Sequence, residues 1–129
     1  FIANPSDYKP PAYYINKGHE LANKNGVSFF MTTSPEEAVK DVDVIVTDVW
    51  ASMGQEEECD KRRIDFDGYQ VNKKLLTLAK EDTIVLHCFP AHRGVELTTE
   101  ILEAHADTIF GESENRLHAQ KAVLVKLLK

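Results

Sequence analysis

The sequence predicts an α/β domain: a doubly wound, mainly parallel sheet with helices on both faces. Short apolar runs rich in β-branched or aromatic residues alternate with helical patterns along the 129 residues. Two of these runs, residues 42–49 and 84–86, are apolar almost throughout, as parallel strands covered on both faces usually are. The length fits one domain with one core.

The strand candidates follow one another at intervals that leave room for helices. They are residues 27–31, 42–47, 83–87 and 108–110. The opening residues Phe1, Ile2 and Ala3 also resemble the end of a buried strand, and Asn4-Pro5 then forms a turn. Because no helix cap or starting methionine precedes them, we expect the chain to be a fragment of a longer protein.

Helix signals separate these strands. A helix over residues 11–25 is expected to end at Gly26, and Ser34, with Pro35 and Glu37 behind it, has the pattern of a capping box. Further caps are predicted at Asn72 for a helix through Ala79, at Thr98 or Thr99 for residues 100–104, and at Ser113 for a final helix through Leu128. The polar stretch 55–67 is interpreted as a solvated helix or a mobile loop.

Composition excludes several classes of function. Lys and Arg total 15 against 21 Asp and Glu, and the net charge of −6 argues against nucleic-acid binding, which relies on clustered basic residues. The two cysteines, Cys59 and Cys88, suggest no disulfide framework, so we expect free thiols in a reducing compartment. No apolar run approaches the roughly 20 residues that span a bilayer. A small-molecule substrate is the remaining expectation.

The first chemically distinctive segment follows the strand predicted before Asp48 and ends at Gly54. Asp48 falls at the carboxyl end of that strand, where this architecture binds ligands, so its carboxylate is placed to hold an ammonium group. Ser52 adds a hydroxyl, and Gly54 allows the loop to hinge over a ligand. The alternative is a simple turn in which Asp48 caps the next segment while Trp50 and Met53 fill the core. The residues alone favour that alternative.

The second segment, from His87 to Gly94, again follows an apolar strand. The thiol of Cys88 beside histidines and an arginine could be a nucleophile with a lowered pKa or a weak hydrogen-bond donor to a substrate. A metal site of His87, Cys88 and His92 is the weaker interpretation, because zinc takes three or four ligands in a familiar spacing and no fourth is evident. Taken singly, each histidine is more often a hydrogen-bonded structural residue.

The third segment, residues 112–120, begins the last predicted helix. Backbone N–H groups at a helix N-terminus attract anions, and Arg116 in the first turn would add donors for phosphate or carboxylate. The alternative is a salt bridge between Arg116 and Glu112, which is the usual state of an isolated arginine.

Taken together, the three segments resemble the motifs of the ornithine carbamoyltransferases. The matching runs are Asp48-Val49-Trp50-Ala51-Ser52-Met53-Gly54, His87-Cys88-Phe89-Pro90 and Glu114-Asn115-Arg116-Leu117-His118-Ala119-Gln120. The resemblance covers essentially the whole chain and implies that residues 1–129 form the Rossmann-like, ornithine-binding domain, lacking its first strand and helix. It also implies that the carbamoyl-phosphate domain is absent, since neither Ser-Thr-Arg-Thr nor His-Pro-x-Gln occurs.

The resemblance implies transfer of a carbamoyl group from carbamoyl phosphate to the side-chain amine of L-ornithine. The products are L-citrulline and phosphate, in arginine biosynthesis or the urea cycle. By motif, Asp48, Ser52 and Met53 would bind ornithine, with Asp48 on the α-ammonium group. The catalytic residues would be Cys88, Asp48 and Arg116, with Cys88 near the reacting amine. Carbamoyl phosphate would be bound by Cys88, by Arg116 and, through its backbone, by Phe89. The family usually has Leu at the position of Phe89, and a backbone contact tolerates that change.

Several expectations follow for the protein as a whole. We expect an isolated fragment to be inactive, no cofactor, no bound metal, a homotrimeric complete enzyme, and a cytoplasmic or, in a eukaryote, mitochondrial-matrix location. Competing interpretations are a different acceptor (putrescine, N-acetylornithine or aspartate), a non-catalytic amino-acid-binding module and, last, a metal-binding module built on Cys88.

Overall fold

The computed structural model describes residues 1–52 and 54–128, and its strands form two parallel pairs. The strands are β1 (Ile2–Ala3), β2 (Met31–Thr32), β3 (Val44–Thr47) and β4 (Ile84–His87). β1 pairs with β2, and β3 pairs with β4 in a register that sets Ile45 opposite Val85. Both pairings are parallel, so the predicted α/β class with a parallel arrangement is confirmed.

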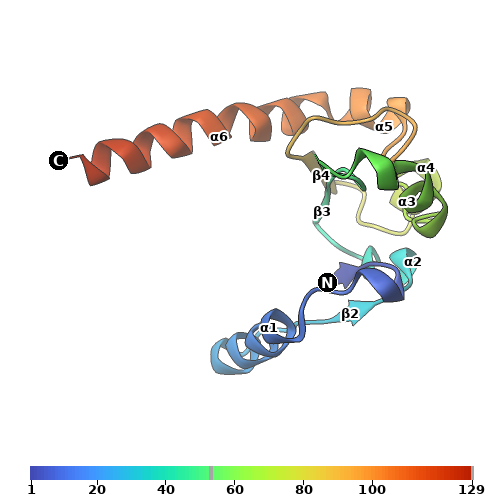
Figure 1. Ribbon diagram of the computed structural model, residues 1–129, viewed down its shortest axis with the longest axis horizontal. Helices are drawn as coiled ribbons and strands as arrows, with labels where there is room; N and C mark the ends of the chain where they lie inside the picture. Colours follow the sequence, from blue (N-terminus) through green and yellow to red (C-terminus); the bar gives the residue numbers. More distant parts are fainter. Residues whose placement is uncertain (53, 129) are drawn as a thin grey trace.

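Helices connect the strands of each pair (Figure 1). They are η1 (Ser6–Tyr8) and α1 (Ala12–Asn25) between β1 and β2, α2 (Pro35–Ala38) between the pairs, and η2 (Glu56–Glu58), α3 (Cys59–Asp65) and α4 (Lys73–Leu76) between β3 and β4. α5 (Thr99–Ala104) and the long α6 (Ala106–Leu127) follow β4. None of the helices in the described residues is long and apolar enough to cross a membrane.

The helix boundaries follow the capping signals closely. Gly26 ends α1 in the left-handed conformation, with a φ of 65°, and the Ser34 hydroxyl accepts a hydrogen bond from the Glu37 amide at the start of α2. Asn72 and Thr98 cap α4 and α5 in the same way. The predictions at these four positions are confirmed, although α4 is shorter than expected.

Two predictions about the C-terminal part of the chain are wrong. Residues 108–110, predicted as a strand, belong to α6, and Ser113 lies inside that helix instead of capping it. The reason lies in packing: Ile109 is fully buried, while Phe110 is half exposed, and the Thr108 hydroxyl donates to the Val85 carbonyl of β4 at 2.8 Å. A run of two β-branched residues and one phenylalanine is as compatible with one buried helix position as with a strand.

The core is built around the β3–β4 pair. Val85, Leu97, Leu102 and Ile109 are almost completely inaccessible to solvent. They join β4, the loop after it, α5 and the first turns of α6 into one cluster. The carboxyl ends of β3 and β4, where the chemically distinctive segments begin, are therefore held by the best-packed part of the molecule.

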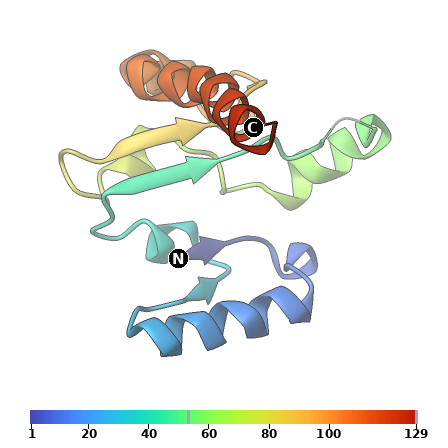
Figure 2. The same cartoon turned by 90° about the vertical axis from the view of Figure 1, so that its left-hand side faces the viewer.

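The two strand pairs are separate, as Figure 2 shows. A cavity of about 450 Å³ is lined by residues of both β1 and β3, and the apolar Val46 of β3 is 67% exposed. Residues 27–30 of the predicted strand 27–31 lie outside any strand, because β2 contains only Met31 and Thr32. The polar stretch 55–67 is mostly helical, as η2 and α3.

Candidate functional site

Asp48 and Cys88 meet at the carboxyl ends of two neighbouring strands. Asp48 follows β3 directly and Cys88 follows β4 directly, and because the strands are parallel and in register, both residues emerge at the same edge. The Cys88 thiol donates to Asp48 Oδ1 at an Sγ–Oδ1 distance of 3.2 Å. The same carboxylate oxygen accepts the Val49 amide at 2.7 Å, which fixes the Asp48 side chain.

Arg116 reaches this edge from α6. Its Nη1 donates to the Cys88 carbonyl at 2.8 Å and to the Phe89 carbonyl at 3.4 Å. The three residues that the sequence singled out, Asp48, Cys88 and Arg116, therefore lie at one place. The alternative of an Arg116–Glu112 salt bridge does not describe these contacts, since both run to backbone carbonyls.

The position of Arg116 within its helix differs from the prediction. α6 begins at Ala106, so Arg116 lies in the interior of the helix, and its own turn offers no free N-terminal amides. Any anion bound here is held by the guanidinium group itself and not by a helix terminus. Both hydrogen bonds leave from Nη1, and a guanidinium group carries five N–H donors in all.

The environment of Cys88 favours the protonated thiol. Burial raises its pKa above the usual range, and the hydrogen bond and negative charge of Asp48 raise the pKa further, against a smaller opposing effect of Arg116. A cysteine nucleophile normally has a lowered pKa, because the thiolate is the reactive form. The site thus disfavours covalent catalysis and suits a neutral thiol that donates or accepts a hydrogen bond.

Phe89 has an unusual backbone conformation, with a φ of 52°. A non-glycine residue adopts this left-handed region only when its surroundings hold it there. Its ring stacks on Phe110 of α6 with centroids 5.4 Å apart, and its carbonyl accepts from Arg116. The Phe89 side chain is therefore an anchor, and its backbone faces Arg116.

The sequence profile described as "Aspartate/ornithine carbamoyltransferase, Asp/Orn binding domain" matches residues 1–127. The chain belongs to this family. The ornithine carbamoyltransferase of Nitratiruptor sp. is 49% identical over 126 residues, which are 98% of this chain and 41% of that protein. The chain thus spans about two fifths of the length of the curated relatives it matches.

Solved carbamoyltransferase structures share the fold of this domain. The anabolic ornithine carbamoyltransferase of Campylobacter jejuni aligns with a TM-score of 0.92 at 40% identity, covering 98% of this chain and 42% of that one. The ornithine carbamoyltransferase of Pyrococcus furiosus aligns with a TM-score of 0.85 at 48% identity, covering 95% and 39%. The arrangement of the two strand pairs and their helices is therefore that of the family.

The remaining predicted ornithine-binding residues of this carbamoyltransferase domain lie on the loop after Asp48. Ser52 is exposed, and its backbone is joined to Gln55 by hydrogen bonds in both directions. Those contacts form a turn and do not bring the Ser52 hydroxyl to Cys88 or Arg116. Met53 lies outside the described residues. Trp50 instead packs inward, stacked on Phe66 with centroids 5.5 Å apart.

Sequence reasoning missed one buried residue at the site. Glu96 is completely buried beside His87, at an Oε1–Nε2 distance of 3.1 Å. A glutamate at the end of a polar loop gives no sign of burial in the sequence, so no signal could have found it. His87 is a hydrogen-bonded structural residue, as the sequence favoured for a histidine taken singly.

The domain offers no evident metal centre in its described part. Among residues 1–52 and 54–128, no group of three or more His, Cys, Asp or Glu side chains is placed to hold a metal ion. Both ring nitrogens of His87 are engaged by protein groups, one by Glu96 and the other by the Phe89 amide. The metal-binding interpretation of His87, Cys88 and His92 therefore gains no support.

Proposed function

We propose that this chain is the ornithine-binding half of an ornithine carbamoyltransferase. The enzyme would transfer the carbamoyl group of carbamoyl phosphate to the side-chain amine of L-ornithine and release L-citrulline and phosphate. The observation that carries the proposal is the meeting of a carboxylate, a thiol and a guanidinium group at one edge of the β3–β4 pair. The relatives named ornithine carbamoyltransferase at 46–49% identity support the same function.

The charges of the site match the two substrates. Asp48 is exposed and negative, and it would hold the α-ammonium group of ornithine by a charge-assisted hydrogen bond. Arg116 would use its remaining donors for the phosphate of carbamoyl phosphate, since a guanidinium group matches phosphate geometry. Fixing both substrates across a few ångströms supplies much of the catalysis in a reaction between two bound molecules.

The chemistry needs no covalent intermediate. The neutral δ-amine of ornithine attacks the carbamoyl carbon, a C–N bond forms and the C–O bond to phosphate breaks. The proton that the amine loses passes to the departing phosphate or to solvent. The neutral Cys88 thiol would accept a hydrogen bond from the amine N–H, so that the nitrogen lone pair stays free to react. Arg116 would stabilise the negative charge that develops on the departing phosphate.

We further propose that a second domain completes the site. The chain covers about two fifths of its relatives, and Asp48 and Arg116 are both solvent-exposed. The other ligands of carbamoyl phosphate would come from the carbamoyl-phosphate domain of the complete protein, assembled as a homotrimer in the cytoplasm, or in the mitochondrial matrix of a eukaryote. The isolated 129-residue chain would then give no citrulline.

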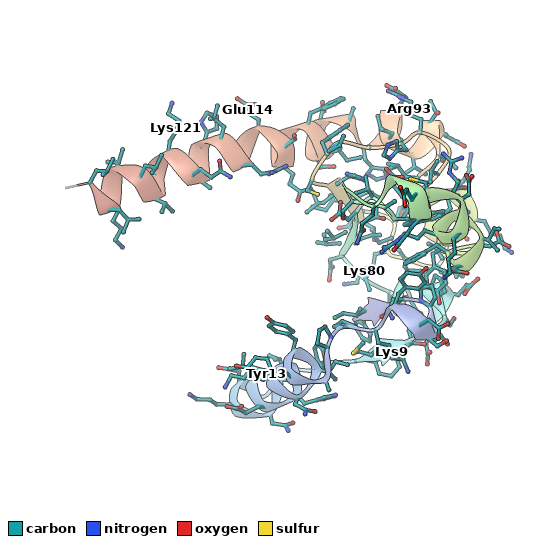
Figure 3. The ribbon with its side chains drawn as sticks, in the orientation of Figure 1. Lys9, Tyr13, Lys80, Arg93, Glu114 and Lys121 are labelled. Atoms are coloured by element: carbon teal, nitrogen blue, oxygen red, sulfur yellow. The ribbon has the colours of Figure 1, made fainter. Side chains whose placement is uncertain are left out.

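A citrulline assay on the complete polypeptide tests the proposal. We expect turnover with L-ornithine, and a loss of about 100-fold or more in kcat/KM for Arg116→Ala, as for other residues that stabilise a developing charge. Lys121→Ala is the matched control, because Lys121 is exposed on the same helix with its side chain directed outward (Figure 3). Preference for putrescine or N-acetylornithine would overturn the choice of acceptor. Ornithine binding without turnover in the complete polypeptide would indicate a binding module instead.

A further inference from the structure

The loop from His87 to Glu96 carries the Cys88 and Phe89 groups of the site, and Glu96 contacts it at two points. One carboxylate oxygen, Oε1, accepts from His87 Nε2 at the start of the loop and from the His92 backbone amide farther along. His87 and Glu96 are both 0% exposed. A single buried oxygen therefore joins two parts of the loop that are separated by the site residues.

The His87 ring transmits this constraint to Phe89. Its Nδ1 accepts the Phe89 amide at 3.0 Å, so Nδ1 carries no proton and the neutral ring carries its proton on Nε2. That Nε2–H then donates to Glu96. The tautomer follows from the hydrogen-bond pattern, because the amide of Phe89 can only donate.

The outcome of this chain of bonds is the unfavourable backbone at Phe89. The φ of 52° is held by the hydrogen bond that the Phe89 backbone amide donates to His87, and the carbonyls of Cys88 and Phe89 both accept from Arg116. The same loop course places the Cys88 thiol on Asp48. Glu96 contacts none of Asp48, Cys88 or Arg116 in the described residues. It acts on the Cys88–Arg116 contact indirectly, through His87 and the loop backbone.

The cost of burying Glu96 argues for a specific role. Its second oxygen, Oε2, is buried with no hydrogen-bond partner among the described residues and lies 3.8 Å from His92 Nδ1. A fully buried carboxyl group with one oxygen unpaired is unfavourable for folding compared with an apolar side chain of similar size. The structural effect of the buried Glu96 is to fix the loop conformation at Phe89.

We propose that Glu96 is a positioning residue: acting through His87, it holds the Cys88–Phe89 backbone against Arg116 and the Cys88 thiol against Asp48. Its importance for catalysis rests on the proposed function, but its effect on the loop does not. The proposal therefore separates into a structural test without substrate and a kinetic test with substrate.

The structural test uses Glu96→Gln and Glu96→Leu in the 129-residue chain, with Cys59→Ser so that Cys88 is the one thiol. Gln keeps an oxygen that accepts both donors, whereas Leu keeps the volume and removes the acceptor. We expect nitrogen NMR to show the Nε2–H tautomer of His87 in wild type and Glu96→Gln. We expect the alkylation rate of Cys88 to rise about tenfold in Glu96→Leu, because the released thiol loses its burial and its Asp48 contact, and to stay within about twofold in Glu96→Gln.

These measurements distinguish a residue that positions the loop from one that only stabilises the fold. A residue that only stabilised the fold would change the urea midpoint and leave the alkylation rate of the folded protein unchanged, so that result would overturn the proposal. Glu100→Leu, an exposed glutamate on α5, is the control for an added leucine. If Glu96→Leu does not fold, the His87 tautomer still decides: a proton on Nδ1 in wild type or Glu96→Gln overturns the proposal.

In the complete polypeptide, Glu96→Leu should lower kcat by about tenfold or more and leave KM for ornithine nearly unchanged, because Arg116 and Cys88 are displaced while Asp48 stays on β3. Glu96→Gln should restore most of kcat. An effect on KM alone would contradict the proposed positioning. Failure of the wild-type enzyme to make citrulline would instead refute the proposed function and leave the substrate-free result standing.

Discussion

Removing the charge of Asp48 should make Cys88 more acidic and more reactive. The carboxylate oxygen lies 3.2 Å from the sulfur, and a unit charge at that distance contributes about 1.3 kcal/mol even in water-like surroundings. Since Asp48 is exposed, we take this screened figure instead of the larger value for a buried pair. The Asp48→Asn variant should therefore hold about tenfold more Cys88 thiolate at a given pH below the pKa.

Asp48→Asn should shift the pKa of Cys88 downward. The Asp48 charge raises the pKa of Cys88, so its removal lowers that pKa toward the ordinary thiol value, while burial continues to hold it up. The lower pKa also makes each thiolate somewhat less nucleophilic, so the rate of alkylation near pH 7.5 should rise by less than the thiolate population. The midpoint of the rate against pH is therefore the more direct readout.

The assay is the pH dependence of iodoacetamide alkylation, followed by mass spectrometry in a Cys59→Ser background. Asp60→Asn is the control, because it removes the same charge from an exposed position on α3. A midpoint that stays where it is, or moves to higher pH, in Asp48→Asn would refute the placement of the carboxylate beside the thiol.

Three further outcomes test the fold. Leu97→Ala should lower the free energy of unfolding in urea by about 2–5 kcal/mol, because Leu97 is fully buried in the core. A loss as small as that of a surface substitution would contradict that burial. Gly26→Ala should cost about 1 kcal/mol or more in the same assay, because Gly26 has a φ of 65°, and an unchanged midpoint would exclude the left-handed cap. Asp65, whose pKa is lowered by Lys61 and then by Tyr8, contributes stability that is present above its ordinary pKa and lost as pH falls through the lowered value. The Tm of Asp65→Asn should accordingly depend less on pH in the acid range than the Tm of wild type, and an equal dependence would contradict the interaction.

The sequence predicted best those features that local chemistry determines. Gly26, Ser34, Asn72 and Thr98 mark helix ends by their own conformational or hydrogen-bonding properties, and the structure confirms all four. Asp48 and Cys88 could be placed together because each directly follows a strand of a parallel pair.

The features that the sequence did not predict depend on tertiary packing. Residues 108–110 are helical because Ile109 packs from α6 against β4, and a run as short as Thr108-Ile109-Phe110 does not distinguish a helix from a strand. The burial of Glu96 depends on the whole course of the loop around His87. Arg116 was expected in the first turn of a helix, whereas it lies ten residues after Ala106, the first residue of α6.

Binding of L-ornithine to the 129-residue chain, followed by amide NMR, is the most direct test of the central claim. We predict shifts centred on the amides of Asp48, Ser52 and Cys88 in wild type, their loss in Asp48→Asn and their retention in Asp60→Asn. Shifts that are absent in wild type, or equally strong in Asp48→Asn, would contradict the assignment of this edge of the β3–β4 pair to ornithine.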